Sequence, residues 1–102
     1  MADHEASMMD HKIRLLSRKV IAEGTVALRF DKPPRFDFKP GQATDLTLLN
    51  PPETDAEGNT RTFSVASAPF EDHLLFATRM RDSAFKRSMN QAPLGTEIKV
   101  SL

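Results

Sequence analysis

The sequence predicts an all-β domain, a six-stranded antiparallel Greek-key barrel with one short capping helix. Apolar and polar residues alternate with a period of two in about six short segments, as they do in strands that have one buried face. Turn residues separate these segments, and the chain of 102 residues contains seven prolines and four glycines. Short strands at this spacing favour a closed or nearly closed barrel.

The first half of the chain predicts three strands. Alternation over residues 13–15 and 26–30 predicts the first two, and the proline pair that follows must end the second. Residues 39–42 have the sequence Lys-Pro-Gly-Gln. This sequence fits a type II turn, because proline presets φ at the first central position and glycine accepts a positive φ at the second. Leu46 and Leu48 then alternate with polar residues in a third strand.

The second half predicts three further strands, and only one of its segments has helical character. The strands cover residues 61–66, residues 74–80 and the last residues, where Ile98, Val100 and Leu102 are expected to face inward.

The helical segment lies just before the last strand. Ser83 is the expected N-cap, because its hydroxyl can accept a hydrogen bond from the first turn. Phe85 and Met89 are four residues apart and share one face, and Pro93 and Gly95 are expected to end the helix.

Composition excludes several classes of function. The chain carries 14 basic and 14 acidic residues, so its net charge of zero argues against a nucleic-acid binder or a polybasic membrane-surface protein. The absence of cysteine excludes disulfides, thiolate zinc sites, iron–sulfur ligation and a cysteine nucleophile. Residues 1–10 are polar and predict a flexible tail rather than a signal peptide. No apolar run is long enough to span a membrane, so we expect a cytoplasmic protein.

The segment around residue 61 carries the chemistry. On a strand, Arg61 and Phe63 point to the same face. The guanidinium can bind phosphate in bidentate fashion, and the ring can stack on a flat heteroaromatic ligand. Ser64 offers a hydroxyl, and the small residues after it leave room for a bulky ligand. A plain strand with Phe63 in the core and Arg61 in solvent fits the same residues.

Four segments together resemble the ferredoxin-NADP reductase superfamily. Residues 61–64, Arg-Thr-Phe-Ser, resemble its Arg-x-Tyr-Ser signature, and the Pro-Gly-Gln turn of residues 40–42 resembles the turn that precedes it. Residues 75–80 resemble the next strand, which a short helix follows, and residues 94–100 resemble the closing strand. The resemblance implies a flavin-binding barrel over residues 11–102.

The resemblance also implies roles for individual residues. Arg61 would bind the FAD pyrophosphate, and Phe63, where the family usually has tyrosine, would pack against the isoalloxazine ring. Ser64 would lie near flavin N5 as the catalytic residue. The other cofactor-binding residues that the resemblance implies are Thr78, Arg79, Met80, Phe85, Lys86 and Arg87.

The turn into the helix departs from the family pattern. Residues 81–84, Arg-Asp-Ser-Ala, stand where many relatives have a glycine-rich turn, and Lys86 aligns with a hydroxyl residue. Asp82 is unfavourable near a pyrophosphate unless Arg81 or Lys86 offsets its charge. FMN therefore remains possible beside FAD.

In the family, a second domain that binds NAD(P)H follows the barrel, and this chain stops at Leu102 on the closing strand. We expect the flavin domain of an NAD(P)H-dependent oxidoreductase, inactive alone, from which the NAD(P)-binding domain is absent. It would pass electrons between nicotinamide and a ferredoxin-like or flavodoxin-like acceptor protein.

The alternative is a non-catalytic barrel that binds a partner protein or nucleic acid, since the OB-fold is also a small Greek-key barrel.

Two other groups of polar residues predict no site. The three histidines lack metal-ligand spacing, so no metal site is expected. Glu53, Asp55 and Glu57 lie in the polar loop over residues 50–60, and they look like a solvated run of acids.

Overall fold

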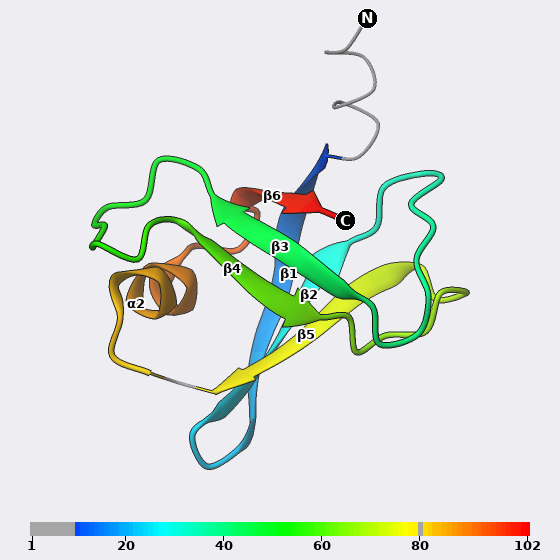
Figure 1. The fold of residues 1–102 in the computed structure, drawn as a ribbon. Helices are drawn as coiled ribbons and strands as arrows, with labels where there is room; N and C mark the ends of the chain where they lie inside the picture. The colour runs from blue at the N-terminus through cyan, green and yellow to red at the C-terminus, as the bar shows by residue number, and fades with distance from the viewer. Residues whose placement is uncertain (1–9, 80) are drawn as a thin grey trace, which may run out of the picture.

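The computed structural model describes residues 10–79 and 81–102, which form six strands and one helix (Figure 1). The helix that it describes is not long and apolar enough to cross a membrane. In chain order the elements are β1 (Asp10–Ala22), β2 (Thr25–Asp31), β3 (Ala43–Leu48), β4 (Thr60–Ser64), β5 (His73–Arg79), α2 (Ala84–Gln91) and β6 (Glu97–Ser101).

The six strands form one antiparallel sheet in the order β4-β3-β6-β1-β2-β5, so β4 and β5 are its two edges. The edges meet just beyond the end of β4. There the Ala66 N–H donates to the Leu75 carbonyl at 2.7 Å, and the Leu75 N–H donates to Ser67 Oγ at 3.0 Å. The predicted all-β, barrel-like fold with one short helix is confirmed; the sheet itself is not closed, and these two bonds join its edges at one end.

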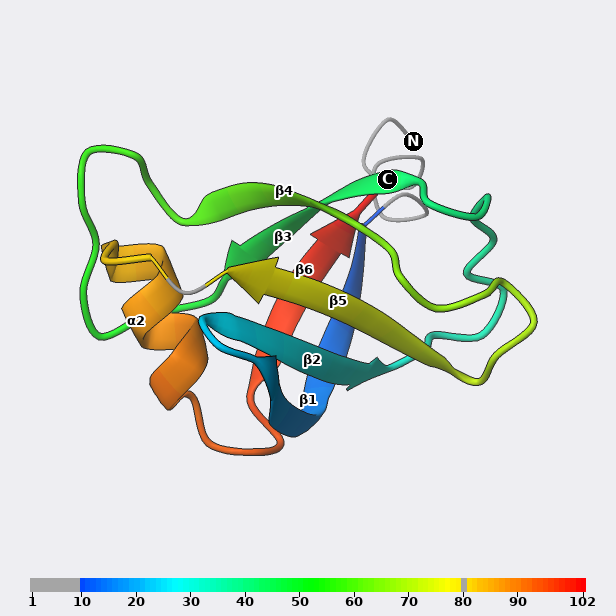
Figure 2. The ribbon, with the colours of Figure 1, turned by 90° about the horizontal axis from the view of Figure 1, so that it is seen from below.

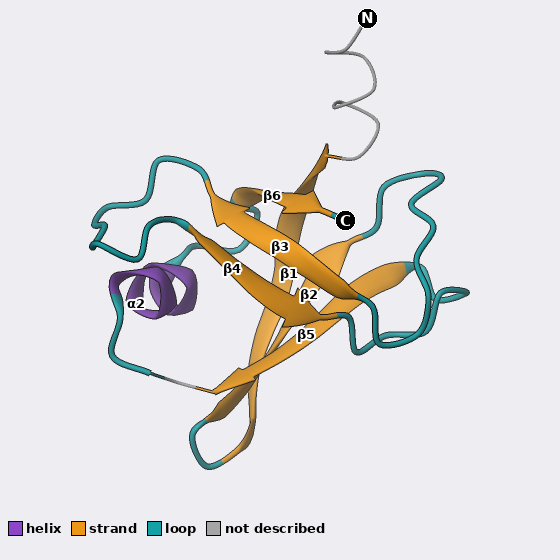
Figure 3. Ribbon diagram, in the orientation of Figure 1, coloured by secondary structure: helices purple, strands orange, loops and turns teal. Residues whose placement is uncertain are grey.

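At their other ends β4 and β5 diverge, and α2 lies beside the gap (Figures 1 and 2). The secondary-structure colouring shows that no strand fills this side of the barrel, so the one described helix covers it (Figure 3). The site described below lies where this gap opens.

The alternating residues build the core as predicted. The rings of Phe30 and Phe76 pack edge to face with 5.9 Å between their centroids, at the pairing of β2 with β5. The buried strand residues are Ile13, Leu15, Val26, Leu28, Phe30, Leu46, Leu48, Leu74, Phe76, Ile98 and Val100. Phe36 and Phe38 are also buried, although they lie in the loop between β2 and β3.

The turn before β3 has the predicted geometry. The Gln42 N–H donates to the Lys39 carbonyl at 3.0 Å, and Gly41 has a φ of 72°, a conformation that favours glycine.

Three predicted boundaries or orientations differ from the structure. Asp10 begins β1 rather than ending the tail, because it pairs with Ser101 of β6, and residues 1–9 lie outside the described part of the chain. Strand β4 is shorter than predicted and ends at Ser64. Leu102 was predicted to face inward, but it is 39% exposed because it lies beyond the end of β6.

Helix α2 is fixed at both ends and along one face. Ser83 is the N-cap, as predicted, and its hydroxyl accepts from the Lys86 N–H at 3.2 Å. Phe85 and Met89 are both buried in the core.

The other end of α2 is held from β1. Arg18 Nη2 donates to the carbonyl of Met89 at 2.9 Å and to that of Ala92 at 2.5 Å. A guanidinium suits this position, because the last carbonyls of a helix carry partial negative charge.

We predict that Phe30→Ala lowers the free energy of unfolding by about 3–5 kcal/mol, because it removes a fully buried ring and leaves a cavity. Phe70→Ala is the matched control, since that ring is 88% exposed and its loss should change stability by less than about 0.5 kcal/mol. Urea unfolding followed by circular dichroism measures both. Similar losses in the two variants would contradict this description of the core.

Candidate functional site

An open cleft of about 540 Å³ lies where β4 and β5 diverge, bounded by these two strands and by the turn into α2. Strand β4 contributes inward-facing residues to it, because Arg61 and Phe63 pair with Leu46 and Thr44 of the buried face of β3. The predicted cofactor residues that line the cleft are Arg61, Phe63, Thr78, Arg79 and Lys86.

The other predicted residues do not line this cleft. Ser64 is exposed on the opposite face of β4, because side chains alternate along a strand. The Phe85 side chain is 1% exposed and belongs to the core. Arg87 does not line the cleft, and it pairs with Glu53 and Asp82. Met80 lies outside the described residues.

Phe63 is the aromatic residue of the cleft. Its ring lies 5.9 Å from that of Phe85 and 6.4 Å from that of Phe76, measured between centroids. Lys86 Nζ lies 5.0 Å from the centroid of the Phe63 ring, which places a cation over the aromatic face. A flat ligand can therefore stack on this face only if the ammonium moves aside.

Lys86 links α2 to the end of β5. Its ammonium donates to Thr78 Oγ1 and, at 3.0 Å, to the Arg79 carbonyl. Partial burial, reinforced by the positive charges of Arg81 and Arg61, lowers the pKa of Lys86 below its usual 10.5. Like charges that gather in this way indicate a place where an anion would be stabilised.

Arg61 is held in place by the ring of Phe85 and by nearby backbone carbonyls. Its side chain is 20% exposed, and the guanidinium carbon lies 5.2 Å from the centroid of the Phe85 ring. Nη1 donates to the carbonyls of Glu57, Gly58 and Thr60 at 3.1, 3.2 and 2.9 Å.

Nη2 of Arg61 is buried and has no hydrogen-bond partner among the described residues. The carboxylates of Asp55 and Glu57 lie 3.9 and 3.8 Å from it, within ion-pair range but too far for a hydrogen bond. A buried donor without an acceptor is costly, and a phosphate oxygen would satisfy it. The residues present therefore fit a phosphate-bearing ligand.

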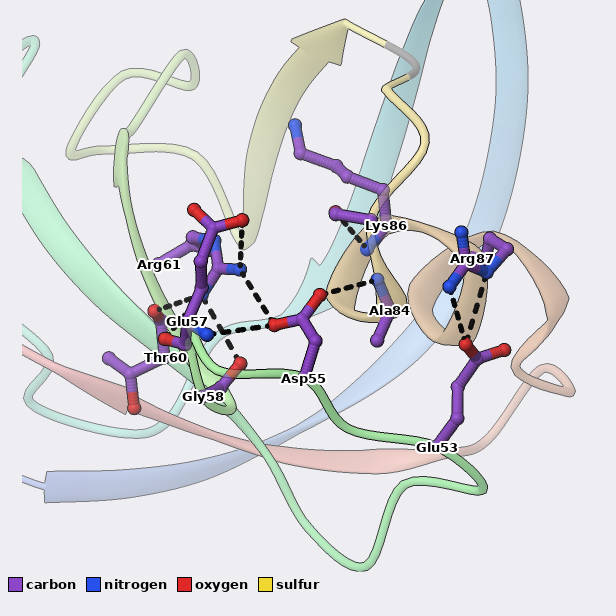
Figure 4. A network of polar contacts seen from close by, with 10 residues as sticks. Glu53, Asp55, Glu57, Gly58, Thr60, Arg61, Ala84, Lys86 and Arg87 are labelled. Carbon is purple, nitrogen blue, oxygen red and sulfur yellow. Dashed lines mark hydrogen bonds and ion pairs between the residues drawn. The ribbon is translucent and has the colours of Figure 1, made fainter.

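The acids of the loop between β3 and β4 are exposed to solvent, as predicted, but Glu53 and Asp55 also make structural contacts that the sequence did not predict (Figure 4). Asp55 Oδ2 accepts from the Ala84 N–H, and Oδ1 accepts from the Glu57 N–H, each at 3.0 Å. These bonds, the first being the larger cause, lower the pKa of Asp55 below its usual 3.8. Glu53 pairs with Arg87 at 2.6 Å.

Asp82 was expected to need Arg81 or Lys86 as its counter-ion. Instead it is paired with Arg87, the residue that also holds Glu53. This pairing offsets the charge of Asp82 with a residue of α2 that does not line the cleft.

Neither the scan for protein families nor the search of curated proteins finds a match to this chain. Solved structures do match. A ferredoxin NADP+ reductase from Neisseria gonorrhoeae with bound FAD and NADP aligns at a TM-score of 0.75 and 20% identity, over 91% of this chain and 37% of that one. A siderophore-interacting protein from Acinetobacter baumannii aligns at a TM-score of 0.68 and 20% identity, over 89% of this chain and 39% of that one.

The cytochrome b5 reductase domain of Ulva prolifera nitrate reductase aligns at a TM-score of 0.68 and 14% identity, over 91% of this chain and 40% of that one. This chain thus shares its fold with the aligned part of these three proteins, and the predicted resemblance is confirmed at the level of the fold. The chain spans about two fifths of the length of each of these three structures.

We predict that the domain loses stability as the pH falls below about 4.5. Hydrogen bonds to Arg87 and Ala84 lower the pKa values of Glu53 and Asp55 below their usual 4.5 and 3.8. Their stabilisation is therefore present above the unfolded pKa values and is lost as the pH falls through the folded ones. Thermal unfolding between pH 7 and pH 2.5 measures the effect.

The Asp55→Asn variant should lose less stability over this range than the wild type does, because it has one such carboxylate fewer. Asp37→Asn, which changes an exposed residue in the loop between β2 and β3, should follow the wild-type curve. If Asp55→Asn and Asp37→Asn gave the same pH profile, Asp55 would not contribute in the way described.

Proposed function

We propose that this chain is a flavin-binding domain that holds FAD in the cleft between β4, β5 and the start of α2. One observation carries the proposal: a buried arginine nitrogen with no hydrogen-bond acceptor among the described residues lies beside an aromatic ring and a helix N-terminus. The fold is shared with a Neisseria gonorrhoeae reductase whose structure contains FAD and NADP.

The cleft residues would divide the work of binding. Arg61 would hold the phosphates through Nη2, and Lys86 would add a second positive charge. Phe63 would lie against the flavin ring once the ammonium of Lys86 has left it, and phenylalanine keeps the stacking surface of tyrosine without its hydroxyl. When bound, the flavin supplies the ability to accept a hydride and to pass on single electrons.

For the whole protein we propose an oxidoreductase of the cytoplasm. NAD(P)H would bind to a domain outside this chain, and the acceptor would be a ferredoxin-like or flavodoxin-like protein. Phthalate dioxygenase reductase, which aligns over 94% of this chain at a TM-score of 0.62, is described as a modular structure for electron transfer from pyridine nucleotides to [2Fe-2S]. That description supports a similar division of labour here.

Incubation with FAD, FMN or a single-stranded oligonucleotide, each followed by desalting, tests the proposal against its alternatives. Retained flavin absorbance supports a flavin domain, and the relative retention of the two flavins decides between them. Retention of the oligonucleotide without either flavin would favour the non-catalytic barrel.

We predict that Arg61→Ala weakens FAD binding at least about tenfold, because a charge-assisted hydrogen bond is worth roughly 1.5–3 kcal/mol. Equilibrium titration of FAD fluorescence measures the dissociation constant. Arg29→Ala is the matched control, since Arg29 is exposed on β2, which does not line the cleft. Equal dissociation constants for the two variants would disprove the phosphate role of Arg61.

Ser64 does not line the cleft, so its proposed role near flavin N5 requires the flavin ring to reach past the end of β4, and this role can be separated from binding. We predict that Ser64→Ala leaves the FAD dissociation constant within about twofold, because the side chain is exposed and does not line the cleft. In a protein that also carries the nicotinamide domain, the same change should slow flavin reduction in stopped-flow measurements. Unchanged reduction rates would remove Ser64 from the reaction.

A further inference from the structure

A carboxylate of the chain itself lies against two groups that could hold a ligand phosphate, although it does not line the cleft. Asp55 Oδ2 accepts from the Ala84 N–H at the start of α2, and Oδ1 lies 3.9 Å from Nη2 of Arg61 (Figure 4). A backbone N–H at a helix N-terminus and an arginine are the two donors that commonly bind phosphate. One acidic side chain, 29 positions away from Ala84, therefore bridges both.

The loop that carries Asp55 is held in this position. The Glu57 N–H donates to Asp55 Oδ1, and the Gly58 N–H donates to the Asp55 carbonyl, each at 3.0 Å. Nη1 of Arg61 donates to three carbonyls of the same loop and the start of β4. The carboxylate is thus placed by a hydrogen-bonded turn, and it does not meet the helix as a freely moving side chain.

The aromatic part of the cleft is closed in the same way, because Lys86 lies over the ring of Phe63 and bonds to Thr78 and Arg79. A ligand with a flat ring and phosphates would therefore displace two contacts that the chain makes with itself. Displacing the carboxylate is the more costly of the two, since Asp55 and a phosphate are both negative and cannot share the same donors.

We propose that Asp55 is an internal competitor for the cofactor's phosphates and thereby sets the affinity of the cleft. This inference rests on the proposed flavin function. Asp55 holds the Ala84 N–H and the side of Arg61 that faces it, and cofactor binding exchanges the carboxylate for a phosphate. Removal of the charge of Asp55 should therefore tighten binding, whereas removal of an ordinary supporting side chain would weaken it.

The test compares Asp55→Asn with the wild type. The amide is isosteric, and its oxygen can still accept the Glu57 N–H in the turn. We expect the FAD dissociation constant to fall about tenfold at pH 7, as measured by quenching of flavin fluorescence. Asp37→Asn makes the same change of charge in the loop between β2 and β3, which does not line the cleft, and should stay within about twofold of the wild type.

Inorganic pyrophosphate is the second probe, because it does not depend on the flavin ring. Its addition to the Asp55→Asn variant should shift the Ala84 amide resonance at a lower pyrophosphate concentration than in the wild type. If Asp55→Asn does not fold, as checked by circular dichroism, Asp55→Ser replaces it, since serine also accepts hydrogen bonds in turns and carries no charge.

The outcomes separate the two proposals. If the wild type binds FAD and the uncharged variant binds it equally or more weakly, Asp55 supports the site and the competitor role is overturned, while the flavin function stands. If no protein binds FAD, the flavin function falls, and pyrophosphate decides the role of Asp55. Tighter pyrophosphate binding by the variant supports that role, and equal or weaker binding overturns it.

Discussion

The contact between Phe85 and Phe63 is the interaction on which the rest of the site depends. It joins α2 to β4 at the point where the two edge strands have separated, with 5.9 Å between the ring centroids. Phe85 is 1% exposed, so the helix covers the open end of the core with this side chain. The first turn of the same helix forms one wall of the cleft. Arg18 holds the far end of the helix and so fixes its direction.

Charge in this region is balanced locally, which explains how a chain with a net charge of zero can offer an anion site. Arg61 and Lys86 line the cleft together with the acids Glu57 and Asp82, and Arg87 pairs with Asp82 and Glu53 from outside it. Asp55 and Glu57 both lie near Nη2 of Arg61, and the Asp55 carboxylate also accepts from the first turn of α2. The charge balance beside Arg61 therefore depends on these two loop acids.

Local patterns in the sequence predicted what depends on local geometry. The period of two placed Leu28 and Phe76 in the core, and the N-cap preference of serine located the start of α2. The shared face of Arg61 and Phe63 followed from the same alternation. The bridge made by Asp55 could not be predicted in this way, because it depends on the path of a loop without periodicity. An acid two residues before a backbone N–H signals an Asx turn, but it does not show which helix the other oxygen meets.

The most direct test of this account is a heteronuclear NMR titration of the domain with FAD. If the cleft holds the cofactor, the amide shifts should change most at Arg61, Phe63 and Ala84, and the Arg61 side-chain resonance should move with them. The exposed loop around Phe70, at the other end of the barrel, should remain unchanged. Shifts centred on any other face, or no shifts at saturating FAD, would contradict the assignment of this cleft as a flavin site.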